Sequence, residues 1–592
     1  MGQFFKFLFA SCLGVFLALT AIIFVGSLVF AQVAMQAEKP PKVSQNTVLH
    51  LTLNNPVPEK TNNVQMPIFD LKSKDILGLH DLMYTLETAQ NDDNIKGVFL
   101  EVDIASLGMS SARSLRQSIM DFRNSGKFVI AHSNFYTQGA YYLVSAADSV
   151  YLNPGGMVDF RGLAVQIPFY KNMLDKVGVN MEIFYAGKFK SATEPYRRSE
   201  MSDGNRLQRR EYLDQIYSRF LGDISQSRNI PVSELRQIAD EFSGSSDKLS
   251  VETGLVDGLA YEDQVFDRIR NKLGLEEDEK IKLVSPEKYF LSKPPKKNYR
   301  IKDKIAVIYA EGTLMDGEEA AGVITEDHYI KMIRKIRKDE KIKAVVLRVN
   351  SGGGSAITSE NILRELQLTK SEGKPIIVSM GDVAASGGYM IAAAGDSILA
   401  ETNTITGSIG VFGMMPIAQK LLNDKLGINI DTISTGQMSS GLTPFYAFSE
   451  KERKIMQTRV EETYASFLSI VAESRGKTSE EIHEIAQGRV WTGPKAVEIG
   501  LVDRIGDLDD AIASAAKSAG LDSYRISEYP ITKDPLQQLL DQVIDLEQTK
   551  MRQQKELLRS QLGEWYPHYE FIQEVSGTKT PQARLPFIIS FE

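Results

Sequence analysis

IKAVVLRVN (Ile342–Asn350) and IKGVFLEVD (Ile95–Asp103) are two versions of one apolar, β-branched segment, 247 residues apart in the chain. Further blocks recur at offsets of 247 to 249 residues: GKFVI with GKPII (126–130 and 373–377), GAYYLVSAAD with GGYMIAAAGD (139–148 and 387–396), and GKFKSATEP with GQMSSGLTP (187–195 and 436–444). So regular an offset over several blocks indicates duplication of a unit far larger than a solenoid repeat. The chain therefore contains two copies of one domain.

Strand-like and helix-like segments alternate within each copy. Each copy opens on an apolar strand, at residues 48–53 and 305–310, and the repeated segments above supply the next strand. Between the strands lie amphipathic stretches such as residues 328–339, whose isoleucines recur at helical spacing. This alternation predicts βαβ units with parallel strands, and so an α/β fold with two tandem domains.

The 592 residues exceed what one hydrophobic core supports, and we divide the chain into six segments. They are an N-terminal membrane anchor (1–34), a linker (35–46), the first copy (47–291), a second linker (292–302) containing SKPPKK, the second copy (303–530), and a C-terminal helix and tail (531–592). Within the last segment, residues 535–563 have the pattern of a charged amphipathic helix. Such a helix favours packing or an oligomer contact over a ligand role.

Composition narrows the function classes. A formal net charge of −8 gives no reason to expect nucleic-acid binding. One cysteine, Cys12, rules out an intrachain disulfide and any cysteine-rich metal site. The six histidines are scattered and form no H-E-x-x-H spacing, so we expect neither a metal catalyst nor another cofactor.

The N-terminal sequence predicts a membrane segment. Residues Phe7–Phe30 carry no charge over 24 positions, which is enough to span a bilayer as a helix. Lys6 precedes them and the first acidic residue is Glu38, which favours the N-terminus inside and the body outside. A cleavable signal peptide ending near Ala31 is an alternative, although the apolar run is longer than usual. Lipid modification of Cys12 is a weaker one, since little apolar sequence precedes it.

The second copy contains two segments whose residues could take part in catalysis. In DVAASGGY (382–389), Ser386 lies among small residues just ahead of an apolar helical stretch, where its hydroxyl would sit beside free helix N-terminal amides. The alternative is a simple N-cap serine. NSGGGSA (350–356) follows a strand, and its glycines allow amides to face a ligand; the alternative is a plain tight turn. A phosphate loop is disfavoured because G-x-x-x-x-G-K-[ST] is absent.

A serine nucleophile needs a base. G-x-S-x-G is absent and no histidine is a compelling partner, so a Ser-His-Asp triad has little support. Lysine can serve if burial lowers its pKa from about 10.4. The candidate for this base is Lys190, and Lys188 is a rival candidate. The alternative interpretation is that Lys190 is an ordinary surface lysine at the end of a strand. Spacing alone does not pair Lys190 with Ser386, and each copy carries only half of the pair: Gln138 stands where the second copy has Ser386, and Ser439 where the first has Lys190.

These motifs together resemble the long, tandem form of the signal peptide peptidase A (protease IV) family, of the Clp protease and crotonase-like fold. KSATEP (190–195) resembles the family's lysine motif, and ASGGY (385–389) its serine motif. TGSIGV (406–411) is similar to the segment whose serine orients the lysine. NSGGGS (350–355) is similar to N-S-P-G-G-S, with Gly352 in place of proline, a change that removes no donor because proline has no N–H.

The resemblance implies a membrane-bound serine endopeptidase. Ser386 would be the nucleophile, Lys190 the general base and Ser408 the residue that orients the lysine, while amides of Gly353 and Gly387 would form the oxyanion hole. No cofactor is implied. Because the lysine and the serine lie in different copies, the site has to form where two copies meet.

The resemblance also implies partners and location. Substrates would be cleaved signal peptides and other extended apolar peptides, bound by strand addition along the glycine strand. The protein would form a homotetramer, anchored through its N-terminal helix in a bacterial inner membrane, with its catalytic body on the periplasmic side.

Two other function classes are compatible with the fold. A crotonase-like enzyme acting on acyl thioesters would need the glycine amides but not the serine–lysine pair. An inactive membrane scaffold would lack Ser386 or Lys190, and both are present.

Overall fold

The computed structural model describes residues 42–531, apart from 54, 64–75, 278, 297 and 318–319, together with residues 6, 7, 13, 14, 17, 20, 558, 562, 566 and 582–584. Most of the expected anchor, residues 7–30, and most of the expected amphipathic helix, residues 535–563, lie outside the described residues. Among the residues that are described, no helix combines the length and the hydropathy needed to cross a membrane.

The first copy is built on a parallel sheet with the strand order β6-β4-β3-β2-β1-β7. Its strands are β1 (Thr47–Thr52), β2 (Ile95–Glu101), β3 (Phe128–Tyr136), β4 (Ser149–Val158), β6 (Gly258–Leu259) and β7 (Lys282–Val284). The helices include α2 (Leu79–Gln90), α3 (Met109–Asn124), α4 (Gln138–Val144), α8 (Val232–Asp240), α9 (Asp247–Glu252), α10 (Glu262–Leu273) and α11 (Pro286–Ser292). Strands therefore alternate with helices, as the sequence pattern predicts.

The second copy repeats this plan, with the strand order β17-β15-β13-β11-β8-β19; β14 also pairs with β13, and β18 pairs with β14. Its strands are β8 (Lys304–Glu311), β11 (Ile342–Ser351), β13 (Ile376–Ala385), β14 (Ser397–Ala400), β15 (Ile405–Gly407), β17 (Val490–Thr492), β18 (Arg504–Ile505) and β19 (Arg525–Tyr529). Its helices include α12 (Glu326–Lys338), α13 (Ala356–Ser371), α14 (Gly387–Ala392), α16 (Ser479–Ile485), α17 (Gly493–Glu498) and α18 (Leu508–Ser518).

The central strands pair in parallel and in the same order in both copies, β1-β2-β3 and β8-β11-β13. Helices cover these sheets on both sides, so strands such as β11 are buried almost throughout and consist of apolar runs. The α/β fold with two copies, expected from the repeat, is confirmed.

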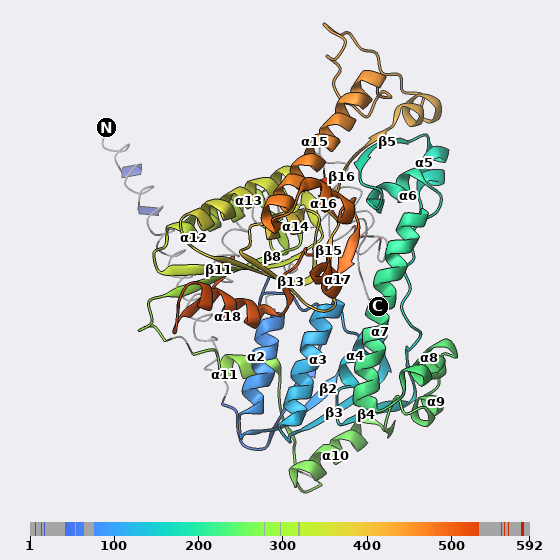
Figure 1. Ribbon diagram of the computed structural model, residues 1–592. Helices are drawn as coiled ribbons and strands as arrows, with labels where there is room; N and C mark the ends of the chain where they lie inside the picture. Colours follow the sequence, from blue (N-terminus) through green and yellow to red (C-terminus); the bar gives the residue numbers. More distant parts are fainter. Residues whose placement is uncertain are drawn as a thin grey trace.

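A third sheet joins the two copies, with the strand order β10-β9-β12-β20-β16-β5. Its strands are β5 (Asn180–Ala186), β9 (Thr313–Met315), β10 (Val323–Thr325), β12 (Gly353–Ser355), β16 (Val411–Ile417) and β20 (Gln582–Arg584). β5 belongs to the first copy, yet it pairs antiparallel with β16 of the second copy over its whole length. Figure 1 shows β5 beside β16 and α15 (Glu450–Arg475), far from the first copy's own sheet. The first copy thus contributes one strand to a sheet of the second copy.

A buried ion cluster also joins the copies. The Arg348 guanidinium of β11 donates to Glu59 Oε2 of the first copy at 2.9 Å and to Glu401 Oε1 at 2.8 Å. Arg348 and Glu59 are only 2% and 5% exposed. Glu311 lies in the same cluster, where burial and the neighbouring Glu59 charge raise its pKa to about 7. One guanidinium therefore neutralises carboxylates from both copies.

We expect Arg348→Met to lower the free energy of unfolding by about 3–5 kcal/mol, because it leaves two carboxylates buried without their counter-ion. Urea denaturation followed by circular dichroism measures this loss. Lys171→Met is the matched control, since it breaks an exposed pair with Asp175 that contributes at most about 0.5 kcal/mol. A loss below about 1 kcal/mol for Arg348→Met would contradict the role given to the cluster.

Candidate active site

Ser386 occupies a strained turn between a strand and a helix. β13 ends at Ala385 and α14 begins at Gly387, so Ser386 sits between them with φ 56° and ψ −119°. A positive φ is uncommon for a residue other than glycine, and the bond from the Ser386 amide to Gly407 O at 2.8 Å helps to hold it. The residue is at the N-cap position, but within the described structure its side chain makes no capping bond. The hydroxyl is therefore available for another role.

Glycines shape the backbone around Ser386. Gly387 is the first residue of α14, where an amide finds no partner inside the helix. A Cβ at Gly388 would lie 2.6 Å from Ser351 O, so only glycine allows this close approach. Gly353 has φ 99°, and its amide donates to Ser351 Oγ at 3.1 Å. Of the two expected oxyanion donors, the Gly353 amide is thus already engaged by a hydroxyl.

Lys190 is carried into the second copy by the chain that follows β5. The Phe189 amide donates to Gln487 O at 2.8 Å, which ties this chain to the second copy. A Cβ at Gly488, whose φ is 77°, would lie 2.6 Å from Lys190 Cβ. Neither Lys190 nor Lys188 lies within the strand itself. Lys188 is exposed, with its ammonium 5.6 Å from the centre of the Phe189 ring, whereas Lys190 is 1% exposed.

The structure brings Lys190, Ser386 and Ser408 together within one chain. Lys190 Nζ lies 2.8 Å from Ser386 Oγ, 3.0 Å from Ser408 O and 3.1 Å from Ser408 Oγ. Both serines are completely buried. The Nζ–Oγ distance falls inside the range for proton transfer between a base and a nucleophile. The contact that the sequence alone could not establish is therefore present.

Burial lowers the pKa of the Lys190 amine well below its ordinary value, because the charged form is desolvated. Its hydrogen-bonding partners are two hydroxyls and a carbonyl, all of them uncharged. Ser408 itself has φ 51°, and its amide donates to Arg489 O at 2.7 Å. A second non-glycine residue is thus held in an uncommon conformation beside the amine.

Sequence reasoning missed Gln208, which holds the lysine segment in place. This residue lies on α7 (Asp203–Arg228) of the first copy and is almost fully buried. Its Nε2 donates to Phe189 O at 3.0 Å, and its Oε1 accepts from the Val490 amide of the second copy at 3.3 Å. A single glutamine on a long helix belongs to no recognisable sequence motif, so its role is visible only from its contacts in the structure.

In the first copy, the position equivalent to Ser386 is occupied by a side chain that is not a nucleophile. Gln138 replaces the serine; its Nε2 donates to Gly162 O at 2.9 Å, and its Oε1 accepts from the Gly162 amide at 2.8 Å. Phe160, fully buried, stands where the second copy has Ser408. The first copy thus has the same fold, but at the position of Ser386 it has a glutamine whose side-chain amide is already hydrogen-bonded.

A slot for one extended strand lies beside the serine. β12, the glycine strand, and β16 are separated by β20, which is antiparallel to both. In this register Arg584 lies opposite Gly353, Ala583 opposite Gly354, and Gln582 opposite both Ser355 and Phe412. A peptide of this chain therefore occupies the space along the glycine strand.

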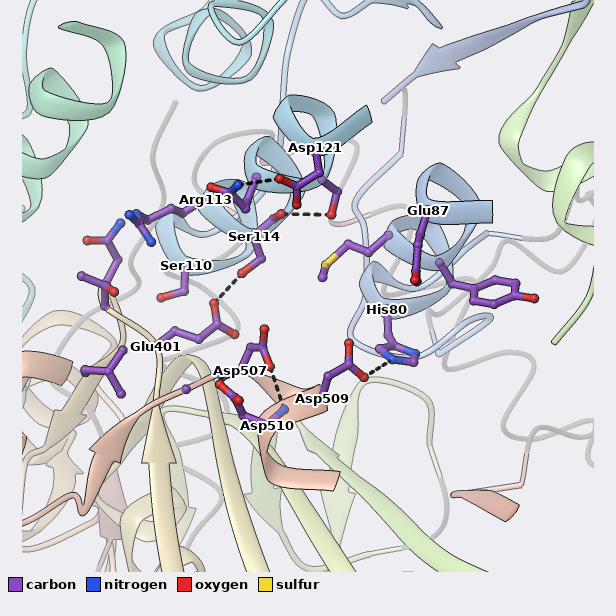
Figure 2. Close-up of a pocket in the computed structure, with 18 of the residues that line it drawn as sticks. His80, Glu87, Ser110, Arg113, Ser114, Asp121, Glu401, Asp507, Asp509 and Asp510 are labelled. Carbon is purple, nitrogen blue, oxygen red and sulfur yellow. Dashed lines mark hydrogen bonds and ion pairs between the residues drawn. The ribbon is translucent and has the colours of Figure 1, made fainter. Parts of the chain in front are cut away.

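A separate pocket of about 620 Å³ lies between the copies, lined by α2, α3 and the start of α18 (Figure 2). Carboxylates line it, and His80 of the first copy contacts Asp509 of the second at 3.1 Å, while Ser114 donates to Glu401 at 2.7 Å. Its lining does not include Ser386 or its partners. Nor do the described residues hold any group of three or more ligands suited to a metal ion.

Two α/β copies that meet at a buried serine and lysine have the architecture of a serine-type peptidase. Sequence comparison gives the family. The model for peptidase family S49 matches residues 121–276 and again residues 369–522, one match in each copy. The chain belongs to peptidase family S49.

Relatives cover most of the chain. It is 36% identical to Protease 4 of Salmonella typhi, over 78% of this chain and 75% of the relative. It is 35% identical to Protease 4 of Haemophilus influenzae, over 74% and 72% of the two chains. The chloroplastic serine protease SPPA of Arabidopsis thaliana is 32% identical, over 81% of this chain and 70% of its own. The family expected from the motifs is confirmed.

Proposed function

We propose that this peptidase uses Ser386 as nucleophile and Lys190 as general base to hydrolyse cleaved signal peptides and other extended apolar peptides. The observation that carries the proposal is the 2.8 Å contact between Lys190 Nζ and Ser386 Oγ in a fully buried setting. The chain itself would be anchored by residues 7–30 in a bacterial inner membrane, with its catalytic body on the periplasmic side, as a homotetramer.

The surroundings of Lys190 fit a neutral amine. A neutral amine has two N–H donors and one lone pair. The donors can reach Ser408 O and Ser408 Oγ, at 3.0 and 3.1 Å, which leaves the lone pair to accept the Ser386 hydroxyl proton. Ser408 thereby orients the amine, and its own conformation is held by the chain around Arg489. Desolvation supports the neutral form, because it lowers the lysine pKa.

The reaction would proceed through an acyl-enzyme. Ser386 Oγ bonds to the peptide carbonyl carbon while its proton moves to Lys190 Nζ. The C–N bond then breaks, and Lys190 returns the proton to the leaving amine. Water next attacks the ester carbonyl carbon and gives one proton to Lys190. The C–O bond to Ser386 then breaks, Lys190 returns that proton to Ser386 Oγ, and the carboxyl product leaves.

Backbone amides would stabilise the oxyanion of each tetrahedral intermediate. The Gly387 amide is at a helix N-terminus, where no intrahelical acceptor competes for it. The Gly353 amide would have to exchange its bond to Ser351 Oγ for the oxyanion. In other enzymes one such donor contributes about 10²–10³ in rate.

Substrates would bind as an added strand between β12 and β16. The pairing of β20 with both strands supports this, because it demonstrates that the slot accepts an extended backbone. The β20 residue Arg584 lies opposite the candidate oxyanion residue Gly353. A substrate running through the same slot would pass the nucleophile.

Ser386→Ala and Lys190→Ala should each reduce peptide hydrolysis by about 10²–10⁴-fold or more, because each removes an essential partner. The double variant should be no worse than either single one, since the two residues act as a unit. Turnover of a quenched fluorescent peptide gives the rates. Lys188→Ala is the control and should retain wild-type turnover. Activity retained in Lys190→Ala but lost in Lys188→Ala would overturn the assignment.

The pH dependence of kcat/KM should follow the neutral fraction of Lys190. The base acts only when deprotonated, so kcat/KM should rise with pH up to the lowered lysine pKa and become constant above it. Lys190→Arg should not restore activity at any pH, because a guanidinium stays protonated. A profile that levels off just above about pH 6.5, as an unperturbed histidine base would give, argues against the lysine.

Ending the chain at residue 581 should lower KM for peptide substrates several-fold, with kcat within about twofold of wild type, because β20 then no longer competes for the slot. Ala583→Pro in the full chain should act in the same direction, since proline removes one amide donor from the ladder. Steady-state kinetics with one peptide substrate measures both. An unchanged KM in both variants would mean that substrates bind elsewhere.

A further inference from the structure

The pocket between the copies is a long groove that follows two neighbouring helices. α2 packs beside α3, and the lining runs from His80 to Gln90 on α2 and from Ser110 to Asp121 on α3. At a rise of about 1.5 Å per residue, these stretches are about 15 and 16 Å long. Residues 401–403 of the second copy lie against the first turn of α3, at the inner end of the groove. The last turns of α2 and α3 form its outer end, so an occupant of the whole groove contacts both copies.

The charged side chains of the groove are mostly carboxylates. Among the lining residues that the structure describes, two are basic, Arg113 and His80, and both are paired with a carboxylate, Asp223 and Asp509 respectively. Figure 2 shows acidic residues of both copies around the pocket. The groove is therefore suited to a cation and unsuited to an anion. The six acidic lining residues are Glu87, Asp121, Glu401, Asp507, Asp509 and Asp510.

Two of these carboxylates, at the outer end, have no counter-ion. Glu87 and Asp121 lie in the last turns of α2 and α3, and both are exposed. Neither forms an ion pair within the part of the chain that the structure describes, and Asp121 accepts only from the neutral Gln117 side chain at 2.9 Å. The negative end of each helix macrodipole makes these carboxylates less favourable still. A bound cation would relieve both effects. The other four carboxylates already accept hydrogen bonds from neighbouring groups.

Two polar atoms at the inner end also lack a partner. Ser110 and Asn403 line the groove and are 1% and 2% exposed. The Ser110 amide donates to Asp382 Oδ1 at 2.8 Å, and Asn403 Nδ2 donates to Met109 O at 3.3 Å. No described group, however, hydrogen-bonds to Ser110 Oγ or Asn403 Oδ1. A buried acceptor without a donor is unfavourable, so a ligand that supplies N–H groups would stabilise this end.

The shape of the groove separates two kinds of cation. Met83 and Tyr84 of α2 lie between its two ends, where apolar side chains can pack against methylene groups. A divalent metal ion instead needs several oxygen ligands gathered at one point. The described residues provide no such group of three or more acidic, histidine or cysteine side chains. The groove thus fits an elongated organic cation better than a compact metal ion.

We propose that this groove binds a linear polyamine, an aliphatic chain with an amine at each end. One ammonium lies near Glu87 and Asp121 at the outer end. The amine at the inner end donates to Ser110 Oγ and Asn403 Oδ1, and the methylene groups lie along Met83. Because the ligand contacts both copies, it stabilises their junction and raises the melting temperature of the protein.

Calorimetric titration of the full chain with spermidine tests the proposal. We expect saturable binding with one spermidine per chain. Glu87→Gln combined with Asp121→Asn should raise the dissociation constant at least tenfold and abolish the rise in melting temperature. Both residues are exposed, so the double variant should keep the wild-type circular dichroism spectrum. The matched control is Glu462→Gln with Asp522→Asn, which removes the same charge from exposed positions outside the groove and should bind like wild type.

Two further comparisons separate this site from general attraction of cations. Gln117→Lys places an ammonium inside the groove at an exposed position, and it should weaken spermidine binding at least tenfold. Butylamine, with one amine, should bind at least tenfold more weakly than 1,4-diaminobutane, and Mg²⁺ at equal ionic strength should not displace spermidine. Absence of saturable binding, equal weakening in the control variant, or displacement by Mg²⁺ would overturn the proposal. None of these readouts depends on peptidase activity.

Discussion

The antiparallel pairing of β5 with β16 is the constraint on which the rest of the site depends. β5 ends at Ala186, four residues before Lys190, and β16 begins at Val411, three residues after Ser408. Because Ala186 lies opposite Val411 in the ladder, the two chains enter the site side by side. The bonds of Gln208 and of the Gln487 carbonyl then remove the freedom that remains in the lysine segment. Lys190 Nζ of the first copy and Ser386 Oγ of the second copy are thereby held 2.8 Å apart.

The fold holds a lysine and two serines of the site in states that cost free energy. A lysine side chain is buried among hydroxyls and a carbonyl, and Ser386 and Ser408 both have positive φ. Such conformations typically cost about 1–3 kcal/mol each and persist only where the surroundings fix them. Two packed α/β copies and the buried Arg348 cluster provide that rigid framework. Burial opposes protonation of the lysine, and the proposed role of general base requires this uncharged form of the amine.

Duplication followed by divergence explains why, among the described residues, a serine–lysine contact forms in the second copy and has no equivalent in the first. In the first copy, residues 170–195 pair with the second copy through β5 and carry the lysine, whereas the equivalent residues 418–444 of the second copy are largely exposed. In the first copy Gln138 and Phe160 fill the positions of Ser386 and Ser408. The first copy therefore lacks the two hydroxyls that Lys190 contacts in the second copy.

The sequence by itself determined the duplication and the α/β class, because repeats and apolar periodicity are local properties of the chain. Its short motifs also proposed Ser386 and Ser408 as site residues, together with a lysine at position 190 or 188. Only the tertiary structure decided that Lys190 rather than Lys188 reaches the serine, because two lysines separated by one residue differ only in the direction in which the turn after β5 points their side chains. Gln208, the Ser351 bond to the Gly353 amide and the occupation of the slot by residues 582–584 likewise carried no sequence signal. Each depends on contacts between segments remote in the chain, and a linear pattern does not encode which remote segments meet.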